Sequence, residues 1–475
     1  MKRNNLTSAI VAGIAGVAGV ANMAGAVNLN PDGLGQVLVY PYYTVNNNNN
    51  TLISVVNTHD EGKAVKVRFL EGYNSREVLD FNLYLSPYDV WVGTIFATGD
   101  GNAPAGLATD DNSCTVPGIK FNNSLPQIHP PEDTRRYAPF RNFAYSDVGN
   151  NPQNQNNDTG PEALSRTREG HIEIIEMAVI TDETEGSLTA LTHVDSVPAD
   201  CNQLIGAWSQ GGYWFNDPTI DTDVPTGGLF GAGSIVNAAE GIIMGYNADA
   251  VDHFRDNVNH AAPGTTDPKL SDAETDAING IASAFVFDSN NAEAVQANGG
   301  LVRADYAVAN GIDAVSAVFT ADNLFNEYNV DTAAGASSEW VITFPTKRFY
   351  VDSAIVGVVV PPFVELFGEN VDGKSCVQVG LLPFDREENP PGSCANGGVD
   401  PSNCIDFSPP IPGVDNRNVF CYEAQVVTFM TAADYTEAGG VSPVLGSRLT
   451  ANVDLSAAYG DAFTGTGWMQ IDLDP

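Results

Sequence analysis

The first part of the chain shows a regular alternation of apolar and polar residues, which is typical of β-strands that bury one face. Val65, Val67 and Phe69 fall on one face of such a segment. Lys66 and Arg68 fall on the opposite face. The same alternation predicts strands over residues 51–58, 63–70, 78–85 and 90–95.

Strand patterns return later in the chain, with one helical segment among them. They predict strands over 171–180, 187–193, 229–246 (two strands around a bend), 340–345, 363–367, 376–382 and 423–430, and a last edge strand over 467–473. Ile312, Val315 and Phe319 recur at helical spacing, so we expect a helix over 312–325. The segment 99–165 is polar and rich in Asn, Pro and Gly, which predicts a long loop.

Successive strands joined by short turns predict antiparallel sheets, and two such sheets make a sandwich. The expected fold is therefore mainly β, with antiparallel β-sandwich-like lobes, long loops and a minor helical segment. The length of 475 residues favours more than one domain. We expect an N-terminal β-sandwich lobe over 27–215 that contains the long loop. A C-terminal β-rich lobe should follow over 228–475, with a helical insert at about 268–327.

The N-terminus has the three parts of a secretory signal peptide. Lys2 and Arg3 supply the charge, residues 9–21 are apolar, and Ala24-Gly25-Ala26 offers a small-residue cleavage site. We therefore expect a signal peptide over 1–26 and an exported protein, either extracellular, on the cell surface or in the periplasm. No later stretch reaches the roughly 18 apolar residues of a transmembrane helix.

Six cysteines in an exported chain favour three disulfides. A zinc site is not indicated, because the spacing contains no C-x₂-C pair. Pairing within sequence neighbours joins Cys114 to Cys201 and leaves three ways to pair the other four. Our preferred set is Cys114–Cys201, Cys394–Cys404 and Cys376–Cys421.

The net charge of the chain limits the classes of partner that it is expected to bind. It has 59 acidic and 21 basic residues, so its formal charge is −38, which disfavours nucleic acid because the phosphate backbone would repel it. Acidic loops suggest calcium as a possible cofactor, since calcium takes oxygen ligands from such loops. The candidate calcium ligands are Asp182, Glu183, Asp221 and Asp223. The alternative is a solvated acidic surface that maintains solubility.

An aromatic cluster offers a second type of site. Trp208, Tyr213, Trp214 and Phe215 lie close together between Gly and Asn residues. Exposed rings of this kind stack on sugars, which predicts a carbohydrate-binding surface. The alternative is a hydrophobic plug packed between the two lobes.

Catalytic motifs are missing from the sequence. There is neither a G-x-S-x-G elbow nor an H-E-x-x-H helix, and the six histidines are scattered. Glu176 shares a strand face with Ile172 and Ile174, while Glu173 shares the other face with Ile175 and Met177, so a carboxylate lies on or near whichever face is buried. Such a carboxylate is either a hydrolase acid or base, or it forms an ion pair with an arginine or lies at the edge of the sheet.

Several segments resemble a group of exported bacterial cell-surface or secreted proteins that have no assigned activity. These segments are residues 35–44, 51–58, 63–91, 246–251, 340–352 and 384–388. The resemblance implies export and a shared architecture, but it carries over no functional residue. We therefore expect a non-enzymatic surface or matrix protein, a structural or adhesive β scaffold that binds itself or surface glycans. The alternatives are a secreted carbohydrate-binding module and a secreted hydrolase with a dispersed site.

Overall fold

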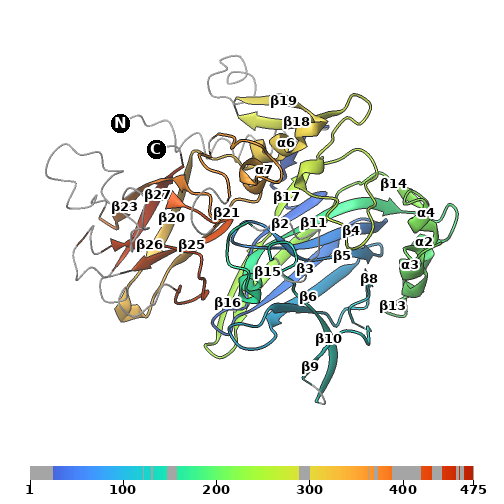
Figure 1. The fold of residues 1–475 in the computed structure, drawn as a ribbon, viewed down its shortest axis with the longest axis horizontal. Coiled ribbons are helices and arrows are strands. Elements are labelled where there is room, and N and C mark those ends of the chain that lie inside the picture. The colour runs from blue at the N-terminus through green and yellow to red at the C-terminus, as the bar shows by residue number, and fades with distance from the viewer. Residues whose placement is uncertain are drawn as a thin grey trace.

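The computed structural model describes residues 25–120, 122–129, 132–146, 158–287, 300–361, 363–367, 373–387, 419–430, 441–455, 459 and 465–473. The fold is mainly β, with 43% of residues in strands and 12% in helices, as the alternation predicts (Figure 1). Its largest part is a sandwich of two sheets.

The first sheet has eight strands, and its central strand is buried along its whole length. In spatial order the path is β1 (Asn28–Leu29), β17 (Asp249–Asp252), β2 (Val37–Thr44), β11 (Glu169–Ile180), β4 (Gly62–Glu71), β5 (Glu77–Leu85) and β8 (Cys114–Val116), while β14 (Thr222–Asp223) pairs with β11 off this path. All these pairs are antiparallel. Thus β11 lies between β2 and β4, two strands that precede it by about a hundred residues in the chain.

The second sheet has seven strands, and its inner face closes the sandwich. In spatial order these are β16 (Ile242–Asn247), β15 (Leu229–Asn237), β3 (Asn50–Asn57), β6 (Val90–Ala97), β7 (Ala105–Ala108), β10 (Asp133–Pro139) and β9 (Gln127–His129). The core between the sheets contains Val65, Val67 and Phe69 from the first sheet and Trp91 from the second. The alternation in the sequence therefore identified the inner face of β4.

The outer face of the eight-stranded sheet is covered by later parts of the chain. The cover consists of α6 (Gly311–Phe319), the hairpin β18 (Ile281–Phe287) and β19 (Leu301–Ala307), and the residues around the 3₁₀ turn Leu270–Asp272. Further along the same face, the carbonyl groups of Ala262 and Thr265 accept hydrogen bonds from Lys66. Lys66 and Arg68 are therefore buried, although they lie on the charged side of β4.

Three short helices lie at one end of the sandwich, opposite the C-terminal sheets (Figure 1). They are α2 (Ser187–Leu191), α3 (Cys201–Ala207) and α4 (Tyr213–Asn216), with the two-residue strands β12 (His193–Val194) and β13 (Val197–Pro198) between α2 and α3. The strand predicted over 187–193 is wrong for most of its length. Leu188 and Leu191 are three residues apart, so in a helix they share the side that packs against the protein.

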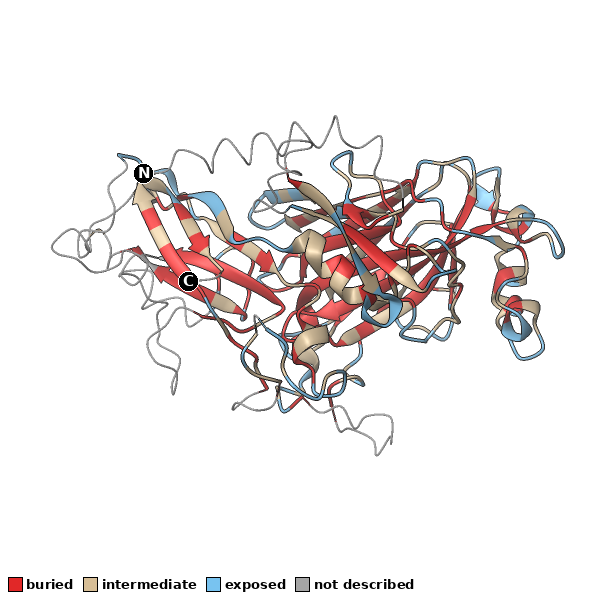
Figure 2. Cartoon of the chain, turned by 90° about the horizontal axis from the view of Figure 1, so that it is seen from above, coloured by how far each residue is buried: buried red, intermediate tan, exposed pale blue. Residues whose placement is uncertain are grey.

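The C-terminal lobe packs two three-stranded sheets around a core of their own. One sheet is β20 (Asn323–Asn329), β27 (Thr466–Asp472) and β23 (Gly380–Asp385), and the other is β21 (Glu339–Thr343), β25 (Ala424–Met430) and β26 (Thr450–Asp454). Nearby are the pair β22 (Val377–Gln378) and β24 (Val419–Phe420) and the short helix α7 (Arg348–Val351). Figure 2 shows buried residues concentrated in the strands of both lobes.

The structure differs from the sequence-based organisation in five places. The predicted boundary at 215–228 falls inside the sandwich, because β15, β16 and β17 belong to its two sheets. The predicted loop over 99–165 contains β7 to β10, and the insert at 268–327 is a hairpin with one nine-residue helix. The predicted edge strand β27 is a central strand, and the described residues 363–367 contain no strand.

Candidate functional site

Two of the predicted disulfides are present. Cys114–Cys201 joins β8 to the first residue of α3, with Cα atoms 5.3 Å apart, and Cys376–Cys421 joins two segments of the C-terminal lobe. The third predicted pair, Cys394–Cys404, lies outside the described residues. The first disulfide fixes the short helices to the end of the eight-stranded sheet.

The predicted aromatic cluster packs mostly into the protein. Trp214 is fully buried, stacks on Tyr84 with ring centroids 5.2 Å apart, and donates its indole N–H to the carbonyl of Ile220. The indole N–H of Trp208 bonds the hydroxyl of Tyr84. Tyr213 also packs on Trp214, and only Phe215 is widely exposed, at 56%. These contacts correspond to a packing role, and the rings pack on the N-terminal sheet rather than between the lobes.

The four candidate calcium ligands do not converge. The carboxylate of Asp221 accepts hydrogen bonds from the backbone N–H groups of Thr184, Glu185 and Ser187. Although burial favours its neutral form, the donors at Ser187 and its neighbours hold the pKa of Asp221 below its ordinary value.

The remaining candidates have other contacts. Asp182 bonds the N–H and hydroxyl of Thr189, Asp223 accepts the N–H of Val224, and Glu183 is exposed. A search of the described residues finds no group of three His, Cys, Asp or Glu side chains placed to hold a metal.

The buried carboxylates of β11 form ion pairs. Oε1 of Glu176 lies 2.7 Å from Nζ of Lys63, and both side chains are fully buried. Glu176 also accepts the N–H groups of Thr226 and Gly227, and burial raises its pKa while Lys63 opposes that shift. Glu173 likewise accepts a 2.6 Å hydrogen bond from Arg68. The ion-pair interpretation therefore describes Glu176, but its partner is a lysine and not the expected arginine; the arginine pair is made by Glu173.

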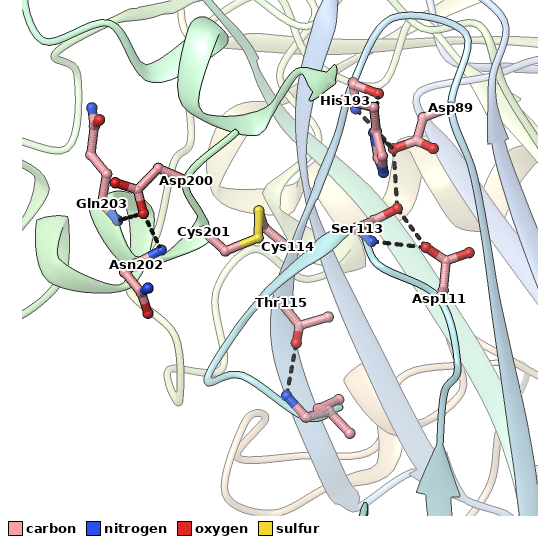
Figure 3. Close-up of a disulfide and its surroundings, with 12 residues drawn as sticks. Asp89, Asp111, Ser113, Cys114, Thr115, His193, Asp200, Cys201, Asn202 and Gln203 are labelled. Atoms are coloured by element: carbon pink, nitrogen blue, oxygen red, sulfur yellow. Dashed lines mark hydrogen bonds and ion pairs between the residues drawn. A yellow bond between two sulfur atoms is a disulfide. The ribbon is translucent and has the colours of Figure 1, made fainter. Parts of the chain in front are cut away.

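A hollow of about 660 Å³ lies beside the Cys114–Cys201 disulfide, between the residues around β8 and the start of α3 (Figure 3). The two carboxylates that line this hollow, Asp111 and Asp200, accept hydrogen bonds from neighbouring residues of its wall. Asp111 accepts the N–H and hydroxyl of Ser113, and Asp200 accepts N–H groups of Asn202 and Gln203 at the start of α3.

A serine, a histidine and an aspartate meet beside Ser113, which lines this hollow and donates a hydrogen bond to the aspartate, Asp89. Sequence reasoning did not single out this cluster. Oγ of Ser86 lies 2.7 Å from Nδ1 of His193, and Oδ2 of Asp89 lies 3.7 Å from the same nitrogen. In a serine hydrolase the hydroxyl and the carboxylate contact opposite ring nitrogens, so that the ring relays a proton. Here both groups lie at Nδ1, so the cluster lacks the relay geometry of a triad.

The most unusual surface is the outer face of the seven-stranded sheet. We call its part on β16, β15, β3 and β6 the uncharged face, because none of the outward positions of these four described strands is ionisable. The outward side chains are Val90, Val92, Thr94 and Phe96 on β6; Leu52, Ser54 and Val56 on β3; Phe230, Ala232, Ser234 and Val236 on β15; and Ile243, Gly245 and Asn247 on β16.

The strand register places these side chains in continuous rows. Val90, Val56 and Phe230 face one another across three strands, and Val236 faces Ile243 across two. Several are widely exposed: Ile243 at 70%, and Leu52, Val90 and Val92 at 43–48%. Charged residues border the face in its turns: Glu61, Asp100 and Glu240. An apolar centre with a charged rim is the anatomy of a protein-binding surface.

Sequence reasoning did not single out this face, although a signal for it exists. β3, β6, β15 and β16 contain no Asp, Glu, Lys or Arg at any position, whereas 17% of the chain is charged. Strands without charge are usually read as buried on both faces. Only the fold shows that one of these faces has no cover among the described residues.

Among the helices in the described part of the chain, none is long and apolar enough to cross a membrane. Comparison of the chain with models of protein families, with curated proteins and with solved structures gives no match in any of the three.

Proposed function

We propose that this protein is an exported, non-enzymatic structural or adhesive protein that docks onto its partner through the uncharged face. The observation that supports this function is an exposed sheet face without an ionisable side chain in a chain of formal charge −38. Solubility alone favours charge on every open surface, so an uncharged face indicates a surface that is covered in use.

The exposed side chains supply enough free energy for docking. Fully burying a Val, Leu or Ile side chain contributes about 1.5–3 kcal/mol. Leu52, Val90, Val92 and Ile243 are each about half exposed or more, so covering them contributes roughly 1 kcal/mol apiece. The flanking apolar residues add to this, and no charge has to be removed from water.

Export is supported by the signal-peptide pattern and by the disulfides, which persist in oxidising compartments. The extensive antiparallel pairing of strands in the two sheets of the sandwich also suits a structural scaffold. The contacts of Trp214 and Glu176 give no support to carbohydrate binding or hydrolysis, because Trp214 is buried against Tyr84 and Glu176 is buried in an ion pair with Lys63.

The test is retention of labelled mature protein on cells whose own copy of the gene is deleted, measured by flow cytometry. Val92→Glu places a carboxylate on the β6 strand of the uncharged face and should reduce retention at least tenfold. Val358→Glu makes the same change at a 73% exposed site in the C-terminal lobe and should leave retention unchanged. Equal retention of the two variants would refute docking through this face.

A further inference from the structure

We propose that the partner at the β16 margin of the uncharged face is a second copy of this chain, joined to the first by antiparallel pairing of their β16 edges about a two-fold axis. This inference rests on the proposed function and names the partner.

β16 lies at the edge of its sheet, and on its inner side Met244 and Tyr246 pack beside Ala424 and Val426 of the C-terminal lobe. β16 is the terminal strand of the seven-stranded sheet, so among the described strands only β15 pairs with it. Five of its six residues form the run Ile242-Ile-Met-Gly-Tyr246, and Ile243 is 70% exposed. The backbone N–H and C=O groups of such an edge are a template for another strand.

This edge also lacks the usual devices that prevent pairing. Natural sheets protect exposed edges with Lys, other charges, Pro or a bulge. β16 carries none of these residues, and its register with β15 is regular along all six residues. An edge strand without these protective features is able to pair with a strand of another chain.

The net charge of the chain favours a second copy of the same chain as the partner that supplies the added strand. A partner of opposite charge would gain most by contacting acidic side chains, which outnumber the basic ones by 59 to 21 in this chain. Two copies of formal charge −38 repel each other, and they can touch without burying carboxylates only where no carboxylate lies. The uncharged face and the β16 edge provide such a surface.

A two-fold axis suits this edge. An isologous contact uses the same patch twice, and a strand paired antiparallel with its own copy satisfies this condition. The two seven-stranded sheets then continue into one another, so that their uncharged faces become one larger apolar surface. The carboxylates that flank β16 in the sequence are Glu240 and Asp249.

The first experiment is sedimentation velocity of the full mature chain between 0.05 and 0.5 M NaCl. Salt screens repulsion between the acidic copies while the uncharged contact is unaffected, so the dimer fraction should rise with salt. A contact made of ion pairs would show the opposite trend. A monomer at every salt and protein concentration, or a dimer that dissociates as salt rises, would overturn the proposal.

The second experiment compares two exposed isoleucines. Ile243→Glu places carboxylates at the β16 junction and should weaken dimerisation at least tenfold. Ile278→Glu makes the same change at a 96% exposed turn remote from β16 and should dimerise like the wild type. Near-ultraviolet circular dichroism of both variants checks that they are folded. Equal dimerisation of folded Ile243→Glu and Ile278→Glu would overturn the proposal.

These results are distinguishable from a failure of the proposed function. A protein that stays monomeric but loses retention on cells through Val92→Glu refutes the second copy and keeps docking through the uncharged face. A dimer that depends on Ile243, with cell retention insensitive to Val92, supports the second copy and refutes the wider docking role.

Discussion

His171 provides a sharp test of the energetics of this fold. It lies in β11, is fully buried, and neither of its ring nitrogens has a hydrogen-bond partner within the described structure. The nearest carboxylate oxygen, on Glu173, is 4.0 Å from Nε2. Burial, aided by Arg68, lowers the pKa of His171 to about 3. The ring is therefore neutral and unsatisfied in the folded protein.

Replacing His171 by Leu should stabilise the protein for two reasons. Removing an unsatisfied buried polar group is worth about 1–3 kcal/mol at neutral pH. In addition, the unfolded chain binds a proton at His171 below about pH 6.5, whereas the folded chain does not until about pH 3. The stability present above pH 6.5 is thus lost as pH falls, by about 1.4 kcal/mol per pH unit for this one group.

The assay is urea unfolding of the wild type and His171→Leu at pH 7.0, 5.5 and 4.5, with the free energy of unfolding extrapolated to water. The variant should be more stable at pH 7.0, and its advantage should grow by about 1.4 kcal/mol per unit below pH 6.5. His129→Leu, at an exposed site, should show neither effect. A destabilised His171→Leu, or an advantage independent of pH, would refute the reasoning.

Three further predictions concern buried contacts. Arg166 donates to Glu71 at 2.7 Å and to Asp158 at 2.6 Å, so Arg166→Met should lower the free energy of unfolding by about 3–5 kcal/mol. Arg386→Met, which removes an exposed ion pair, should leave the free energy of unfolding unchanged. Equal shifts of the urea midpoint in the two variants would contradict this prediction. Trp214→Ala empties a fully buried site and should cost about 3–5 kcal/mol, to be measured by thermal unfolding; a cost below 1 kcal/mol would mean that the ring is not packed as described. Replacing both Cys114 and Cys201 by Ser removes a cross-link between residues 87 apart and should cost about 2–5 kcal/mol; an unchanged melting temperature under oxidising conditions would count against a structural role.

The sequence predicts the strands of this fold better than their surroundings. The alternation in β4 gives its bounds to within one residue at each end and identifies the inner face that carries Val65 and Phe69. It does not show that Lys66 on the other face is covered, because that cover comes from residues about 200 positions later. The outward side of β6, with Val90 and Val92, is open although it looks like an interior. The charged outward face of β4 is therefore buried, whereas the uncharged outward face of β6 is exposed.

Short elements and strand order were harder to predict. Ser187–Leu191 is too short for its helical period to stand out from a strand pattern, and its packing on the sandwich decides its conformation. β27 has an ordinary strand pattern, but its central place between β20 and β23 depends on partners far away in sequence. The uncharged face was hard to predict for the same reason. Its residues are ordinary in the sequence, and only the sheet register brings them into one surface.

The position of β11 has a consequence for the order in which the chain folds. Residues up to 168 contain β2 and β4 but not the strand that separates them, so the eight-stranded sheet cannot close until β11 is available. β15 to β17, which complete both sheets, come later still. Because such long-range pairings form slowly, a chain that emerges N-terminus first stays open while it is being made. The same delay leaves strand edges in need of protection until the sandwich closes.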